Sequence, residues 1–188
     1  PGGARRYRGG MTPLAERIAE ARRLLHGHYG FQDFRPLQRR VVQSVLAGRD
    51  ALAVLPTGGG KSICFQVPAL VLGGLTVVVS PLVALMQDQV GALVRRGIGA
   101  ATLNSLLPAE EQAAILARMA GGDLRLLYVS PERAPTLALE LLRRGLRAGL
   151  MLWSCLGLAS ALSCGNGRDG GEQNLDPDDP NMPHLVSL

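Results

Sequence analysis

The feature that most constrains this chain is an apolar run followed by a glycine-rich turn and a second apolar stretch, at residues 51–65. The run ALAVL, residues 51–55, predicts a fully buried strand of a parallel sheet. Three consecutive glycines, Gly58, Gly59 and Gly60, then permit unusual backbone angles and let the chain pass close to a ligand. Lys61 and Ser62 open an apolar helix over residues 63–72.

A helix that starts after such a turn can bind an anion, because its first N–H groups and the positive end of its dipole face the turn. Lys61 adds a point charge for the outer phosphates of a nucleoside triphosphate, and the Ser62 hydroxyl suits Mg²⁺. The pattern G-x-x-x-x-G-K-[ST] requires glycine at position 55, where this chain has Leu55, so only the core of the P-loop pattern is met. Lys61 is the only lysine, which favours a role for its compact ammonium. The alternative is a turn that merely caps a helix.

Short apolar runs alternate with helical patterns along the rest of the chain. We expect strands over residues 75–79, 100–103 and 124–129, and helices over residues 13–26, 36–47, 81–93, 110–119 and 135–146. This alternation predicts an α/β domain whose parallel sheet is covered by helices on both faces. The P-loop is expected at the carboxyl ends of the strands, where such sheets bind ligands.

Composition narrows the class of protein. A chain of 188 residues that is 47% hydrophobic is long and apolar enough for one globular domain. Residues 1–150 carry a net charge of +9 and residues 151–188 are acidic, so the body is compatible with nucleic acid, although solvated arginines give the same balance. Three cysteines without a metal-ligand or disulfide pattern favour a cytoplasmic protein, nucleoid-associated if bacterial. No apolar run is long enough to suggest a membrane helix.

Small polar residues follow each of the three predicted strands after the P-loop. Carboxyl ends of parallel strands meet at one edge, so we expect these residues to lie together. Hydroxyls, amides and helix starts are typical ligands of a nucleic-acid backbone, although Ser-Pro is also a routine helix entry. The residues are Ser80, Pro81, Asn104, Ser105, Ser130, Pro131, Glu132 and Arg133.

Taken in order and spacing, these segments resemble the first RecA-like domain of RecQ DNA helicases over about residues 24–146. The segments are FQDFRPLQ, PTGGGKSICFQVPAL, TVVVSPLVALMQDQV, TLNS and LLYVSPER. The resemblance implies that ATP and Mg²⁺ bind at the P-loop. It also implies that ATP hydrolysis drives 3′–5′ movement along single-stranded DNA, in recombination and repair.

The resemblance assigns roles to individual residues. Phe31 would stack on the adenine, Gln38 would hydrogen-bond the adenine edge, and Arg35 would help to fix the nucleotide, whereas Phe34 is expected in the core. Lys61 would be the catalytic residue and Ser62 the magnesium ligand. The strand-end residues given above would hold the DNA strand. The residues that would cradle the phosphates are Pro56, Thr57, Gly58, Gly59, Gly60, Lys61 and Ser62.

The resemblance stops near residue 148. The family next has a strand that ends in Asp-Glu-x-His, whose carboxylates hold magnesium and position the attacking water. This chain has no Asp or Glu between Glu140 and Asp169. We therefore expect a disordered leader at residues 1–11, a RecA-like ATP-binding domain at residues 12–148 that is incomplete at its C-terminal end, and a divergent, disordered or artefactual tail at residues 149–188.

Such a chain would be an N-terminal helicase segment that lacks both the acidic motif and a second RecA-like domain, and would be inactive alone. Two other readings remain open. One is a non-enzymatic module that binds a nucleotide or single-stranded DNA, and the other is another P-loop NTPase such as a small-molecule kinase. Salt-sensitive binding to single-stranded DNA separates the kinase from the first two.

Overall fold

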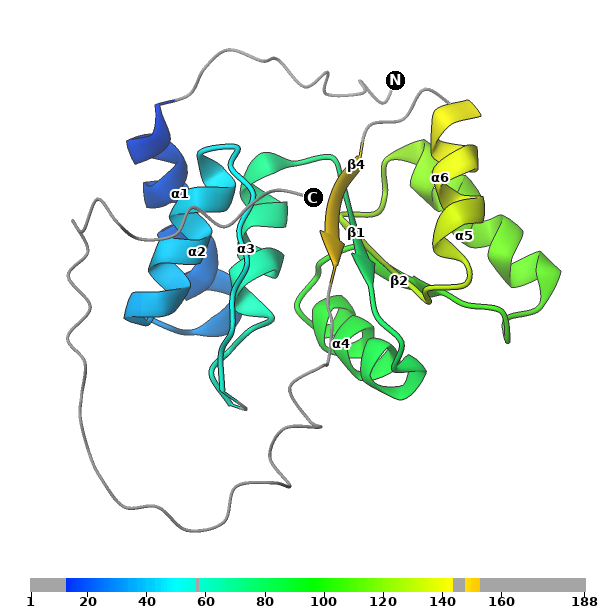
Figure 1. Ribbon diagram of the computed structural model, residues 1–188, viewed down its shortest axis with the longest axis horizontal. Helices are drawn as coiled ribbons and strands as arrows, with labels where there is room; N and C mark the ends of the chain where they lie inside the picture. The colour runs from blue at the N-terminus through cyan, green and yellow to red at the C-terminus, as the bar shows by residue number, and fades with distance from the viewer. Residues whose placement is uncertain (1–12, 57, 144–147, 153–188) are drawn as a thin grey trace, which may run out of the picture.

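The computed structural model of the chain describes residues 13–56, 58–143 and 148–152. A parallel sheet lies at the centre, with helices on both faces and two further helices packed outside one of these layers (Figure 1). The elements in chain order are α1 (Leu14–Tyr29), α2 (Pro36–Leu46), α3 (Ile63–Leu72), β1 (Leu75–Val79), α4 (Val83–Arg95), β2 (Ala100–Leu103), α5 (Ala109–Gly121), β3 (Leu126–Val129), α6 (Ala134–Arg143) and β4 (Ala148–Leu152).

The four strands are all parallel and lie in the order β2-β3-β1-β4. Their last residues are in register across the sheet, since Leu103 pairs with Val129, Val129 with Val79, and Val79 with Leu152. The four carboxyl ends therefore form one straight edge. The predicted α/β class, with a helix-covered parallel sheet, is confirmed.

Each face of the sheet has its own apolar core, because successive strand residues point to opposite faces. On one face, Val78 and Tyr128 pack with Phe65 of α3 and Met86 of α4. On the other face, residues of β1, β2 and β3 pack against α5 and α6. Figure 1 shows α5 and α6 together on that side of the sheet. The central strand β3 is fully buried along its length, as its uninterrupted apolar sequence requires.

Helix α3 is buried on all sides because it lies between two layers, and Gln66 is its one polar side chain. Its residues 63–69 are all buried, which is the pattern of a helix without a solvent face. Its inner side contacts the sheet through Phe65, and its outer side contacts α1 and α2 through Val67, beside Leu25 and Val42. Phe34 is 5% exposed within this outer cluster, so the prediction that it is a core residue is confirmed.

The predicted strand at residues 51–55 is wrong. These residues form no regular element, and the side chains of Leu52 and Val54 are 68% and 88% exposed. A strand needs a neighbour to pair its backbone groups, and residues 51–55 pair with none of the four strands of the described sheet. The sequence had suggested that the glycine turn follows a strand end. Among the described residues it follows an irregular segment instead.

Several boundaries differ from those predicted, and some expectations fall outside the described residues. Helix α1 continues to Tyr29 and ends where Gly30 adopts a φ of 74° and donates its N–H to the His26 carbonyl. Strand β4 crosses the boundary that the sequence placed at residue 148. Residues 1–12 with the expected leader, Thr57, residues 144–147 and residues 153–188 lie outside the description. Within the described part, no helix is both long and apolar enough to cross a bilayer.

Candidate nucleotide site and strand-end surface

The glycine turn before α3 has a backbone that only glycine fits well. Gly58 and Gly60 have φ angles of 78° and 74°, and Gly59 donates its N–H to the Pro56 carbonyl at 2.9 Å. A Cβ on Gly60 would lie 2.3 Å from Nε2 of Gln38, and a Cβ on Gly59 would lie 2.9 Å from the Pro56 oxygen. The turn is thus a close-fitting loop that passes directly into a helix start, as a phosphate cradle requires.

The first turn of α3 is built from the residues that follow these glycines. Ile63 donates its N–H to the Gly60 carbonyl at 3.1 Å, and Gln66 donates its N–H to the Ser62 carbonyl at 2.9 Å. Lys61 and Ser62 are both half-buried at this helix start. Their backbone N–H groups precede the helical hydrogen-bond ladder, and such groups are the ones available to an anion.

Lys61 folds back over the turn. Its Nζ donates to the Leu55 carbonyl at 2.8 Å and to the Pro56 carbonyl at 3.0 Å. The ammonium is therefore held beside the glycine loop, within the same short segment. An ammonium that reaches a phosphate from this position exchanges two carbonyl contacts for contacts to a more strongly charged acceptor.

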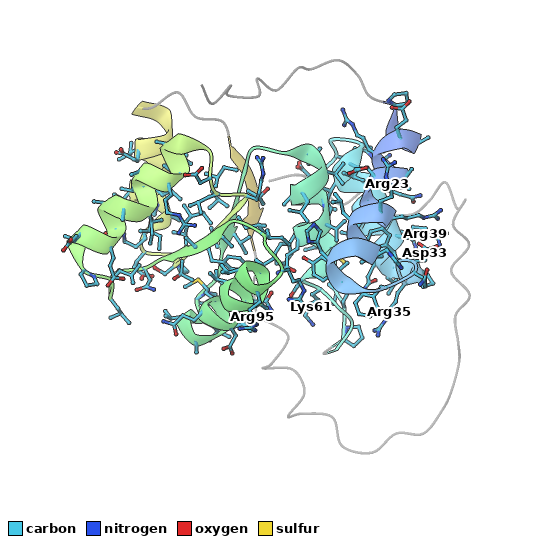
Figure 2. All side chains as sticks on the ribbon, turned by 180° about the vertical axis from the view of Figure 1, so that it is seen from behind. Arg23, Asp33, Arg35, Arg39, Lys61 and Arg95 are labelled. Carbon is cyan, nitrogen blue, oxygen red and sulfur yellow. The ribbon has the colours of Figure 1, made fainter. Side chains whose placement is uncertain are left out.

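Two residues at the start of α2, the N-cap Arg35 and Gln38 of the first turn, contact the glycine turn directly. The buried Gln38 accepts a hydrogen bond from the Arg35 N–H at 2.9 Å and donates from Nε2 to the carbonyls of Gly59 and Gly60, at 2.9 and 3.4 Å. Nη1 of Arg35 donates to the Gly58 carbonyl at 3.1 Å. The structure thus brings Arg35 and Gln38 to the P-loop. Figure 2 shows where Arg35 and Lys61 project from the ribbon.

Phe31 is 51% exposed on the loop between α1 and α2, in contrast to the buried Phe34 three residues later. An exposed aromatic ring is free to stack on a planar ligand, whereas a core ring is not.

Asp33 fixes this loop, and sequence reasoning missed it. Its carboxylate accepts the Phe34 N–H at 2.7 Å and pairs with Arg22 of α1 at 3.3 Å and with Arg39 of α2 at 2.5 Å. Figure 2 shows Asp33 beside Arg39. The hydrogen bond from Phe34, followed by the two arginines, lowers the pKa of the Asp33 carboxyl. The available signal was an acid located two residues before Arg35, within a loop between arginine-rich helices.

The strand-end residues lie along one edge, as the sequence predicted. Ser80, Asn104 and Ser130 directly follow β1, β2 and β3, and each is at most 2% exposed. The Ser80 N–H donates to the Val129 carbonyl at 3.0 Å, and the Ser130 N–H donates to the Leu103 carbonyl at 3.2 Å. These bonds extend the sheet by one residue and hold the three polar residues side by side. Pro81 and Pro131 follow as exposed residues.

Glu132 organises the hydroxyls of this edge. It accepts hydrogen bonds from the Oγ atoms of Ser105, at 3.0 Å, and Ser130. The bond from Ser130 is the main reason that the pKa of Glu132 is lowered. A hydroxyl has one hydrogen, so neither serine donates to another acceptor while it bonds Glu132.

The same edge is tied to α5. Nη2 of Arg133 donates to Oε1 of Gln112 at 2.7 Å, and Nε2 of Gln112 donates to the Leu107 carbonyl at 2.7 Å. Asn104 uses its Oδ1 to accept the Leu106 N–H at 2.9 Å. We call the eight residues Ser80, Pro81, Asn104, Ser105, Ser130, Pro131, Glu132 and Arg133 the strand-end surface.

Two further kinds of site come into question for the described residues, a metal centre and a reactive thiol. None of them form a group of three or more His, Cys, Asp or Glu side chains that would hold a metal ion. The thiol of Cys64 is buried in α3, and this burial raises its pKa to about 11. Such a thiol is protonated at neutral pH and acts as a small apolar side chain.

Comparison with known proteins agrees with this combination of a parallel sheet, a glycine turn before a buried helix, and a polar strand-end surface. The chain belongs to the DEAD/DEAH box helicase family, which it matches over residues 35–149.

Its relatives include RecQ proteins, as the resemblance had predicted. The chain is 46% identical over 128 residues to "ATP-dependent DNA helicase RecQ" of Haemophilus influenzae, covering 66% of this chain and 21% of the relative. It is 55% identical over 104 residues to the protein of the same name from Synechocystis sp., covering 55% of this chain and 22% of the relative. The chain thus spans about a fifth of the length of these curated relatives.

A solved structure supports the fold. The crystal structure of DUF1998 helicase MrfA superposes with a TM-score of 0.52 at 20% identity, covering 69% of this chain and 21% of that chain. This likeness concerns the arrangement of helices and strands only.

Proposed function

We propose that this chain is an ATP- and DNA-binding domain of a RecQ-like helicase, whose ATP hydrolysis drives 3′–5′ unwinding of duplex DNA in recombination and repair. The observation that carries the proposal is the contact of Arg35 and Gln38 with the glycine turn, at 3.1 and 2.9 Å. A base-recognition segment and a phosphate cradle that touch each other form one nucleotide site. The family and the names of the RecQ relatives agree with that site.

The residues of the turn fit a triphosphate. Gly59 and Gly60 leave no room for a Cβ, and such close packing lets backbone N–H groups approach phosphate oxygens. In the proposed complex the phosphates lie over residues 56–62, including Pro56, Thr57 and Gly58, with Lys61 on the outer phosphates and Ser62 on Mg²⁺. Phe31 stacks on the adenine. ATP would supply the free energy of its hydrolysis to the motor.

Replacing Lys61 by alanine tests the nucleotide site. We expect Lys61→Ala to weaken binding of a fluorescent ATP analogue at least tenfold, because a charge-assisted contact of about 1.5–3 kcal/mol is lost. Fluorescence titration measures this affinity. Arg95→Ala is the matched control, since Arg95 is an exposed cation at the end of α4 (Figure 2). Unchanged binding in Lys61→Ala would refute the nucleotide site.

For the strand-end surface we propose contact with the sugar-phosphate backbone of single-stranded DNA. Hydroxyls, amides and helix starts are suitable ligands, and residues 1–150 carry a net charge of +9. Ser105 is exposed, whereas Ser80, Asn104 and Ser130 are at most 2% exposed, so the proposed contact with these three requires the edge to open. A carboxylate repels a phosphate, so Glu132 is not proposed to bind DNA itself. Ser105 and Ser130 donate their hydroxyl hydrogens to Glu132 in this structure, so in the proposed complex these hydroxyls leave the carboxylate before they donate to a phosphate. A small-molecule kinase, the competing reading, has no use for this edge.

Hydrolysis is where this chain departs from its family. Strand β4 ends at Leu152, and the sequence then reads Trp153-Ser154-Cys155, without the acids that hold magnesium and orient water. We expect the purified chain to bind ATP and labelled oligothymidine, with DNA affinity that falls as salt rises. Its phosphate release should not increase when DNA is added. DNA-stimulated hydrolysis would contradict the proposed inactivity, and salt-independent or absent DNA binding would favour the kinase reading.

A further inference from the structure

Gln66 is a buried polar residue whose entire amide is used. It lies on α3 and is 4% exposed. Its Oε1 accepts a hydrogen bond from the Tyr29 hydroxyl at 2.9 Å, while its Nε2 donates to Oε1 of Gln89 at 2.8 Å and to the Tyr128 hydroxyl at 2.9 Å. An amide nitrogen has two hydrogens, so both are committed.

The three partners come from three different elements, α1, α4 and β3. Burial raises the pKa of Tyr29 to about 12, which keeps its hydroxyl protonated as the donor to Gln66. The Tyr29 ring is also held from the outside, because the Arg96 guanidinium lies 5.1 Å from its centroid. These contacts do not belong to the nucleotide cradle, nor to the strand-end surface.

Each partner, however, adjoins one of the proposed ligand segments. Tyr29 is two residues before Phe31, and Tyr128 is two residues before Ser130. Gln89 lies on α4, the helix that follows Ser80 and Pro81. Gln66 itself follows the glycine turn by one helical turn, and its N–H bonds the Ser62 carbonyl. The side-chain amide of Gln66 therefore contacts α1 just before the loop that carries Phe31, β3 just before Ser130, and α4, while the main-chain N–H of Gln66 bonds the first turn after the glycines.

We propose that Gln66 is a positioning residue that couples the nucleotide site to the strand-end surface, so that a bound nucleotide and bound single-stranded DNA strengthen each other. The proposal rests on the proposed function, since it requires both ligands. A buried amide suits this role because its hydrogen bonds are directional: a shift of α3 relative to α1, α4 or β3 breaks a bond whose partner is then buried and unpaired. Because the network joins these elements, a ligand that fixes the position of α3 also restrains α4 and β3.

The test measures coupling rather than affinity. The dissociation constant of dye-labelled oligothymidine is determined by anisotropy, with and without saturating adenylyl imidodiphosphate, for the full chain. For the wild type we expect the analogue to tighten DNA binding about tenfold, within the roughly 5- to 150-fold range of typical coupled sites. In Gln66→Met, which keeps the length of the side chain, this ratio should fall to nearly one, while DNA affinity without nucleotide changes less than threefold.

A matched control separates positioning from general loss of stability. Val67 is the next residue of α3, is fully buried, and has no part in the polar network. Val67→Ala should lower the thermal midpoint but keep the wild-type ratio. An unchanged ratio in Gln66→Met, or an equal loss in Val67→Ala, would overturn the proposal.

Single-bond variants cover the case in which Gln66→Met does not fold. Tyr29→Phe removes only the bond to α1, and Gln89→Met removes only the bond to α4. Each should reduce the ratio partly, and a wild-type ratio in both would overturn the proposal. If the wild-type chain binds both ligands but neither changes the affinity for the other, this inference is refuted and the proposed function is not. A chain that binds neither refutes the proposed function and this inference with it.

Discussion

Gln38 and Gly60 depend on each other. The amide of Gln38 reaches the carbonyls of Gly59 and Gly60 only because position 60 has no side chain, and the left-handed φ of Gly60 turns its carbonyl toward that amide. A side chain at position 60 would conflict with the backbone angle and with the amide at once. These two costs can be measured separately, because another glycine in the chain has the first and lacks the second.

Replacing Gly60 by alanine tests this interdependence. Gly97 has a φ of 73°, and a Cβ at this position would meet nothing within 4 Å, so Gly97→Ala reports backbone strain alone, about 1 kcal/mol. Gly60→Ala should lower the free energy of unfolding by about 2 kcal/mol or more, because the Gln38 amide must also leave its carbonyl partners. Urea denaturation measures both. Equal losses in the two variants would show that Gln38 does not restrain the turn.

Asp33 makes the loop between α1 and α2 sensitive to acid. The pKa of its carboxyl is lowered in the folded protein, chiefly by the Phe34 N–H and then by Arg22 and Arg39. The stability that it contributes is therefore complete above its ordinary pKa of 3.8 and is lost as the pH falls further. Asp33→Asn should reduce the thermal midpoint at pH 6 and reduce it less near pH 3, where part of the stability has been lost. The same reduction at both pH values would mean that its ion pairs do not stabilise the loop.

At the scale of elements, the sequence predicts well wherever the signal is local. The apolar run of β1 and the apolar sequence of α3, interrupted only by Gln66, identify both elements, because a strand or helix buried between two layers has no solvent-facing side. The run at residues 51–55 has the same composition but forms no strand. Strand formation depends on a neighbour elsewhere in the chain, and composition carries no information about that neighbour.

In the candidate site, too, the parts with a local sequence signal were predictable and the parts that depend on distant contacts were not. The glycine turn, Lys61 and the three strand ends were predictable, because each is a short run with its own chemistry. The grouping of Ser80, Asn104 and Ser130 followed from the rule that parallel strands share a carboxyl edge. The roles of Asp33 and Gln66 were not predictable, since Asp33 pairs with arginines of α1 and α2 and Gln66 contacts residues on three other elements. A lone Asp or Gln in a sequence does not reveal such partners.

At the scale of the whole molecule, the proposed nucleotide site is assembled from two substructures. Phe31, Arg35 and Gln38 belong to the segment that runs from α1 into α2, whereas the glycine turn and Lys61 belong to the part that leads into α3. The two parts are joined through an apolar cluster in which Leu25, Val42 and Leu46 contact residues of α3. The peptide link between them is the exposed, irregular segment at residues 51–56.

That exposed link has a consequence for limited digestion. A protease selective for apolar side chains should cut near Leu52 and Val54, where the chain is accessible and no ladder of hydrogen bonds protects it. The two fragments should then separate on a denaturing gel but migrate together under native conditions, held by the cluster around α3. Resistance of this link to the protease would contradict its exposure. If the two fragments stay associated, they form a complementation pair. One fragment then carries Phe31, Arg35 and Gln38, and the other carries the glycine turn of the proposed nucleotide site.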